Sequence, residues 1–169
     1  MFFSLKMLYF LDVEFFIKPG GDIIIKELAI LPHDSVNEEP LVFLFKASFE
    51  WRRLNDKYKR KNELISMMNG LTWESGSIHY TEISNILQFY LADASEIVVN
   101  NEIKRKWIEG FGFHAINIEL SNVTSPNSDN LCNNHDKKFK KVSCAKHNVK
   151  YMKKSYYLIK SGIEPMEWE

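Results

Sequence analysis

Apolar residues recur along the chain at two spacings, and each spacing predicts one type of secondary structure. Near the N-terminus, apolar runs at 5–12 and 23–31 lie on either side of a Pro-Gly-Gly-Asp turn at 19–22, which is the pattern of a β-hairpin. A polar loop at 32–40 leads to a third apolar run at 41–45. We therefore predict an antiparallel meander of three strands.

Helical spacing dominates the rest of the chain. At 80–92, one face of an amphipathic helix is apolar, with Ile83, Ile86, Leu87, Tyr90 and Leu91. Further helices are predicted at 51–68, 101–109 and 144–159, and two short strands at 97–99 and 115–120. In the helix at 101–109, we expect Ile103, Trp107 and Ile108 to face the core.

This order of elements predicts an α/β fold with a mixed five-stranded sheet and flanking helices. The chain has 169 residues, of which 45% are hydrophobic and 14% aromatic, so it can bury the core of a single domain. We expect one domain over 1–169, with its core at about 5–160.

Charge and cysteine content limit the environment in which the chain works. The formal net charge is zero, which argues against bulk attraction to nucleic acid but allows local basic patches. The apolar N-terminal segment is interrupted by charges and has no cleavage site, so we expect neither a signal peptide nor a membrane span. Two cysteines do not form a disulfide framework, and they suit a reducing cytoplasmic or nuclear setting.

The two cysteines belong to two matching Cys-x-x-His pairs, Cys132 with His135 and Cys144 with His147, and eight residues separate the pairs. In such a pair a thiolate and an imidazole converge on one ion across a tight turn, and a second pair completes a tetrahedral site. The pattern predicts a structural Zn²⁺. The alternative is a pair of unrelated buried thiols beside solvated histidines.

Several runs combine basic with aromatic residues, as surfaces that follow a phosphate backbone and stack bases do. The aromatic candidates are Tyr58, Phe139 and Tyr151. The alternative for each run is a solvated helix face or loop. The candidate nucleic-acid contacts are Lys57, Lys59, Arg60, Lys61, Lys104, Lys140 and Lys141.

The element order, with Asp12-Val13-Glu14 at the end of the first strand, resembles the RNase H-like 3′ to 5′ exonuclease domain of the DEDD superfamily. In that family an Asp-x-Glu pair helps to hold two catalytic metal ions. The resemblance aligns Lys104 and Asn148 with the other two carboxylates, and Ser143 with the general base. It therefore implies an RNase H-like fold that keeps only Asp12 and Glu14 of a degenerate acidic site. An ammonium facing Asp12 would fill the place of a metal.

The cysteine and histidine pattern is similar to that of the Maelstrom domain, an RNase H-like domain of the animal small-RNA pathway that has lost the exonuclease carboxylates. The resemblance implies a Glu-Cys-His-Cys zinc site formed by Glu119, Cys132, His135 and Cys144, which would staple the loop before the last helix. The residues themselves leave His147 open as the fourth ligand in place of Glu119.

Two classes of function follow. The first is a degenerate nuclease domain that binds single-stranded RNA, as in small-RNA silencing or transposon control, with weak metal-independent RNase activity as a variant. The second is a zinc-stabilised module that binds a protein partner through Phe49, Trp51 and Trp73. Core packing is the alternative for these aromatic residues, above all for Trp73 and for Trp107.

Overall fold

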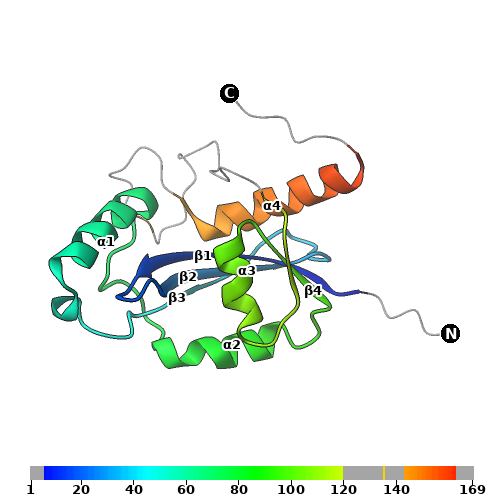
Figure 1. Ribbon diagram of the computed structural model, residues 1–169. Coiled ribbons are helices and arrows are strands. Elements are labelled where there is room, and N and C mark those ends of the chain that lie inside the picture. The colour runs from blue at the N-terminus through cyan, green and yellow to red at the C-terminus, as the bar shows by residue number, and fades with distance from the viewer. Residues whose placement is uncertain (1–5, 120–134, 136–142, 163–169) are drawn as a thin grey trace.

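The computed structural model describes residues 6–119, 135 and 143–162 as an α/β fold built on a mixed five-stranded sheet (Figure 1). The order across the sheet is β3-β2-β1-β4-β5. β2 runs antiparallel to both β1 and β3, whereas β4 runs parallel to both β1 and β5. The strands are β1 (Leu8–Ile17), β2 (Ile23–Pro32), β3 (Leu41–Leu44), β4 (Glu96–Val99) and β5 (Ala115–Asn117).

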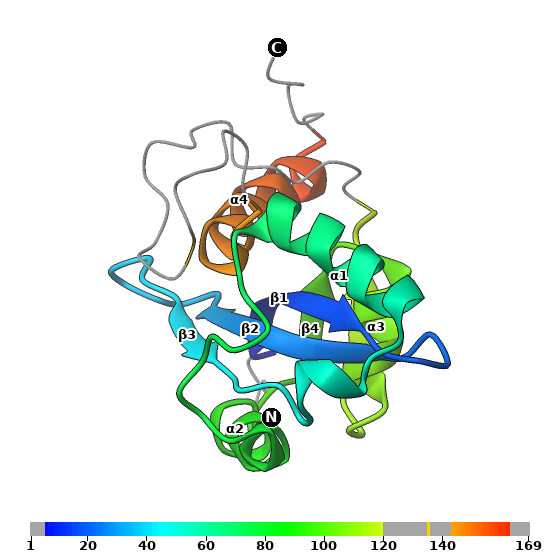
Figure 2. The ribbon, with the colours of Figure 1, turned by 90° about the vertical axis from the view of Figure 1, so that its left-hand side faces the viewer.

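Helices cover both faces of the sheet. α1 and α4 lie on one face, and α2 packs on the other (Figures 1 and 2). The helices are α1 (Asp56–Asn69), α2 (Ile83–Tyr90), α3 (Glu102–Glu109) and α4 (Ala145–Lys160), with short 3₁₀ turns at Trp51–Arg53 and Tyr80–Glu82.

The predicted hairpin, meander and helices are confirmed, with shifted ends. The strand expected to end near Asp12 continues to Ile17, so Asp12 and Glu14 lie inside β1. The helix expected at 51–68 is divided, because the Asn55 side chain accepts a hydrogen bond from the Tyr58 N–H and caps a new helix there. Gly70, in the left-handed conformation with φ of 66°, ends α1 at Asn69, one residue after the predicted end at 68.

One inward position of α3 was predicted wrongly. Ile108 is buried and Trp107 packs against the core, but Ile103 is 54% exposed. Lys104 takes the inward position instead and is 7% exposed. A lysine is tolerated there because its ammonium pairs with a buried carboxylate, described below.

Trp73 does not contribute to the exposed aromatic surface that the protein-binding alternative placed at Phe49, Trp51 and Trp73. Trp73 is buried and lies 5.3 Å and 5.5 Å, between ring centroids, from Phe49 and Trp51. Its indole N–H donates to the Phe49 carbonyl at 2.9 Å. These rings form a small core with Phe16 beside β1, and the core-packing alternative holds for Trp73.

The side chain of Lys26 in β2 connects the loop after Trp73 to the sheet. The buried ammonium of Lys26 donates to the carbonyls of Trp73, at 2.9 Å, and Ser75. Burial lowers the pKa of Lys26 to about 8 because it disfavours the charged ammonium. The negative charge of Glu74 offsets this effect only in part. Gly76 follows, with φ of 114°, and a Cβ there would lie 2.2 Å from the Phe45 carbonyl oxygen.

Gly76→Ala is therefore expected to destabilise the protein strongly, because the methyl group collides with backbone in addition to straining φ. Gly112→Ala is the control, since Gly112 has a similar φ of 92° but open space around its Cβ position. Chemical denaturation should show a loss of about 1 kcal/mol for Gly112→Ala and at least about 3 kcal/mol for Gly76→Ala. Equal losses would contradict the close approach.

Candidate functional site

Three carboxylates gather on the α4 face of the two central strands. Asp12 and Glu14 are two residues apart on β1 and therefore lie on the same face of the strand. Glu14 lies opposite Glu27 of β2 in the antiparallel register. Asp12 and Glu27 are fully buried, and Glu14 is half-buried. The start of α4 lies against them, as hydrogen bonds from Ser143, Ala145 and Asn148 show.

Both oxygens of Asp12 are occupied by side chains from two helices. Lys104 Nζ lies 2.5 Å from Asp12 Oδ1, and Asn148 Nδ2 donates to Asp12 Oδ2 at 2.8 Å. Asn101 caps α3 by accepting from the Lys104 N–H at 2.9 Å, which fixes the helix so that Lys104 points inward. The contact predicted between Asp12, Lys104 and Asn148 is thus present.

The nearby carboxylates determine the charge state of Lys104. Burial disfavours the ammonium of Lys104, but Asp12 and Glu14 outweigh it and raise the pKa of Lys104 above its usual value. Lys104 therefore stays charged as a fixed internal cation. Because it is buried and paired, it is not the exposed nucleic-acid contact that was expected at this position.

Glu14 is in the opposite situation. Burial and the neighbouring charge of Asp12 raise the pKa of Glu14 to about 7, although Lys104 and a hydrogen bond from the Ser143 hydroxyl lower it. Asn148 Nδ2 also lies 3.3 Å from Ser143 Oγ. Ser143 and Asn148 thus serve as hydrogen-bonding partners of the two carboxylates of β1.

A second cluster, beside the first, is formed by Glu27, His135 and Cys144, and it could hold a metal ion. All three residues are buried, and their ligand atoms lie within 4.8 Å of one another. His135 Nε2 is 2.9 Å from Glu27 Oε2, and the Ala145 N–H donates to Glu27 Oε1 at 2.8 Å. Ligand atoms around a tetrahedral zinc are about 3–4 Å apart, given bonds of about 2.0–2.3 Å, so the donor set fits one ion.

The orientation of the His135 ring supports metal binding. Its Nδ1–H donates to the carbonyl of Asn69, the last residue of α1. Because a carbonyl can only accept, Nδ1 carries the hydrogen, and a neutral ring then presents the Nε2 lone pair to the cluster. Ligating histidines commonly have their second nitrogen held in this way.

The predicted zinc ligands are only partly brought together. His135 and Cys144 are in the cluster, and Cys132 lies outside the described residues. Glu119 is exposed and is not part of the cluster, and its N–H donates to the Asn117 side chain at 2.8 Å. His147, the alternative ligand, is also not part of it.

The carboxylate of the cluster is Glu27, which the sequence reading passed over. Glu27 stands in the apolar run at 23–31, where every second residue is expected to be buried. A charge at such a position needs a partner, and that requirement was the available signal. The expectation for Glu119 came from a resemblance in the order of residues, which does not show which strand α4 packs against.

The candidate phosphate contacts differ in accessibility. Lys57, Arg60 and Lys61 of α1 are exposed and Lys59 is half-buried, with the Lys57 and Lys61 ammonium groups 5.9 Å and 5.5 Å from the Tyr58 ring centroid. Lys140 and Lys141 lie outside the described residues. In α4, the basic run is partly engaged, since Lys153 pairs with Glu38 at 2.5 Å and Lys150 lies 3.8 Å from Glu39.

Comparisons of the chain with models of protein families, with curated proteins and with solved structures find no match. Among the described residues, none of the helices has the length and apolar character needed to cross a bilayer.

Lys104→Met is expected to destabilise the fold by about 3–5 kcal/mol, because it leaves buried carboxylates without their cation. Lys106→Met, on the exposed face of the same helix, is the control and should change stability by at most about 0.5 kcal/mol. Urea denaturation at neutral pH measures both. Similar stability of the two variants would show that Lys104 does not neutralise Asp12.

Proposed function

We propose that this chain is a catalytically inactive RNase H-like domain that works by binding single-stranded RNA, with a structural zinc ion that anchors its last helix. The observation that carries the proposal is the ammonium of Lys104 at Asp12, where the exonuclease resemblance expects a metal ion. The mixed sheet, with Asp12 and Glu14 inside its central strand, supports the same assignment.

The argument against catalysis is one of charge and space. A two-metal site needs about four carboxylates to balance two divalent ions, whereas Asp12 and Glu14 provide two. Lys104 and Asn148 already use both oxygens of Asp12, and Lys104 adds a positive charge that repels a second cation. The residues therefore favour a retained fold without the hydrolytic chemistry.

The second cluster suits zinc better than a harder ion. Its donors are a thiol sulfur, an imidazole nitrogen and a carboxylate oxygen, from Cys144, His135 and Glu27. Cys132 is the natural fourth ligand, because the Cys-x-x-His spacing keeps it close to His135. A closed four-ligand site of this kind stabilises the fold and does not activate water.

Purified protein is expected to contain about one equivalent of zinc, and Glu27→Gln should remove most of it. Glu119→Gln is the matched control and should leave the zinc content unchanged, because Glu119 is exposed and outside the cluster. Elemental analysis and thermal unfolding measure both effects. A folded Glu27→Gln protein that keeps its zinc, or a Glu119→Gln protein that loses it, would contradict the ligand set.

Single-stranded RNA is expected to bind through phosphates, mainly at Lys57, Lys59, Arg60 and Lys61, so its affinity should fall steeply with salt. Each phosphate contact removed by alanine substitution should reduce the slope of log affinity on log salt by about 0.7. Lys106→Ala, an exposed lysine on α3, is the control. Failure to bind RNA at about 50 mM salt, where this attraction is strong, would exclude the RNA-binding part of the proposal.

The test of catalysis is a comparison of two sets of variants. The protein should lack magnesium- or manganese-dependent 3′ to 5′ exonuclease activity, and Asp12→Ala should leave any residual RNase activity unchanged. The double variant Lys104→Asp/Asn148→Asp restores a four-carboxylate site and should bind Mn²⁺ measurably more tightly than the original chain. Loss of a magnesium-dependent activity in Asp12→Ala would instead reveal a live site.

A further inference from the structure

The outward face of α1 carries a stripe of six residues with two kinds of side chain. Asn62 and Asn69, on the opposite side of the helix, are buried. The stripe is about 16 Å long at 1.5 Å per residue. Its N-terminal half is basic and its C-terminal half is apolar: Lys57, Arg60 and Lys61, then Leu64, Met67 and Met68.

The apolar half is unusually open to solvent. Leu64, Met67 and Met68 are 63%, 54% and 67% exposed. Single exposed apolar residues are common, but three at spacings of three and four residues on one helix form a continuous face. Such a spacing is typical of helices that dock into a partner.

The stability of the helix does not account for this composition. Cations in the first half of a helix oppose its macrodipole, and the last turn of α1 has no basic residue to complement it. Leucine and methionine favour a helix, but at more than half exposure each of these side chains buries little apolar area. Basic residues placed against the macrodipole and an open apolar face thus lie on one surface, which favours an interaction there.

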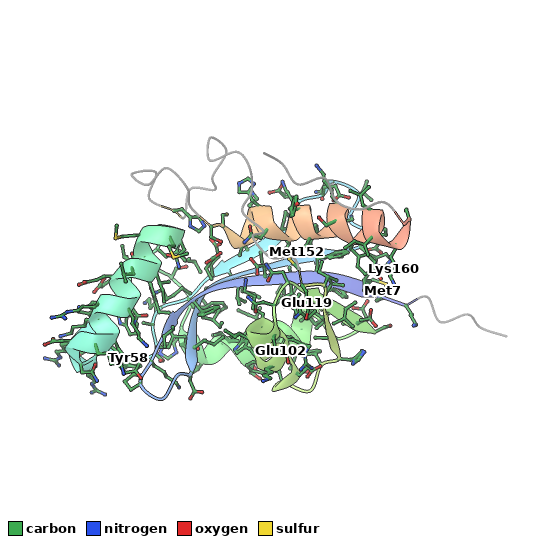
Figure 3. All side chains as sticks on the ribbon, turned by 45° about the horizontal axis from the view of Figure 1, so that its top comes forward. Met7, Tyr58, Glu102, Glu119, Met152 and Lys160 are labelled. Carbon is green, nitrogen blue, oxygen red and sulfur yellow. The ribbon has the colours of Figure 1, made fainter. Side chains whose placement is uncertain are left out.

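The stripe is also held rigidly. The Asn62 side chain accepts from the Ile17 N–H and donates to the Ile17 carbonyl, each at 2.8 Å. The last turn is fixed by the Ser143 N–H, which donates to the Met68 carbonyl at 2.8 Å, and by His135 at Asn69. α1 stands at one end of the molecule, with Tyr58 toward the end of the helix away from α4 (Figure 3). A fixed, protruding face loses little entropy on binding.

We infer that α1 docks against an amphipathic helix of a partner protein whose apolar stripe continues into a cluster of carboxylates. Charge complementarity identifies this occupant, because the basic half needs anions and the apolar half needs aliphatic contacts. RNA satisfies only the basic half, since aliphatic side chains offer bases no ring to stack on. Leucine and methionine suit a helix partner, because flexible thioethers adapt to its ridges.

This inference goes beyond the proposed function, and it has a regulatory consequence. Lys57, Arg60 and Lys61 are the same cations proposed to bind phosphates, so the partner helix and RNA exclude each other. The partner would displace RNA without any change in the fold.

The test uses a synthetic, fluorescein-labelled amphipathic helix with leucines at helical spacing followed by a turn of glutamates. The control peptides have a scrambled order, or lysine in place of glutamate. Single-stranded RNA and anionic phosphatidylserine vesicles are measured in parallel by anisotropy and co-sedimentation. The protein variants are Leu64→Ser/Met68→Ser, Lys57→Glu/Arg60→Glu/Lys61→Glu, and the control Leu158→Ser, an exposed leucine of α4.

The acidic peptide should bind with a Kd of about 100 µM or below, as weak helix interfaces do, and should compete with RNA. Leu64→Ser/Met68→Ser should weaken the peptide about ten-fold while changing RNA affinity less than about two-fold. The charge-reversed variant should lose both ligands and gain the lysine peptide. Leu158→Ser should change nothing.

Absence of peptide binding at about 1 mM overturns the inference, as does equal weakening by Leu158→Ser. If Leu64→Ser/Met68→Ser instead weakens RNA binding or vesicle binding, the stripe serves those ligands and not a protein helix. Peptide binding without RNA binding would leave this inference standing and reject the RNA-binding proposal. Unchanged thermal unfolding of the variants, whose substituted residues are exposed, excludes misfolding as the cause.

Discussion

A carboxylate buried inside a central strand cannot remain ionised without a partner, and the partner of Asp12 is the ammonium of Lys104. This one requirement sets much of the arrangement around it. Lys104 occupies an inward position of α3 where an apolar residue is expected. Asn148 of α4 donates a hydrogen bond to the second oxygen of Asp12. Two helices distant in sequence are thereby fixed to the same point of β1. The charge that a metal ion would supply is built into the chain.

The second cluster extends the same scheme to α1. Glu27 lies opposite Glu14 on the neighbouring strand and is close to His135, Cys144 and the first N–H group of α4. His135 also holds the carbonyl that ends α1. A metal ion at this cluster would join the sheet, α1 and α4 at one place. Stability and the presentation of the α1 surface therefore depend on the same few buried polar contacts.

These contacts show how the fold accommodates three carboxylates next to one another. The carboxylates accept hydrogen bonds from within the chain, from Lys104, Asn148, Ser143 and the Ala145 N–H. Among the candidate nucleic-acid contacts that the structure describes, the exposed ones, Lys57, Arg60 and Lys61, lie on α1. Under the proposed function, anions would be recognised at the surface of this helix and not over Asp12 and Glu14, which suits displacement of one ligand by another.

Local patterns in the sequence determined the elements: the turn at 19–22 made a hairpin, the spacing of Ile83, Leu87 and Leu91 made a buried helix face, and Gly70 ended α1. The contacts of Lys104 and Asn148 with Asp12 agree with what the resemblance led us to expect, whereas periodicity alone would not have indicated them. The exposure of Ile103, the packing of Trp51 against Trp73 and the position of Glu27 beside His135 and Cys144 were decided only by the tertiary structure. Periodicity shows which residues share a face, but the element that covers that face, and hence the partner of each buried charge, is set by the global packing of the chain.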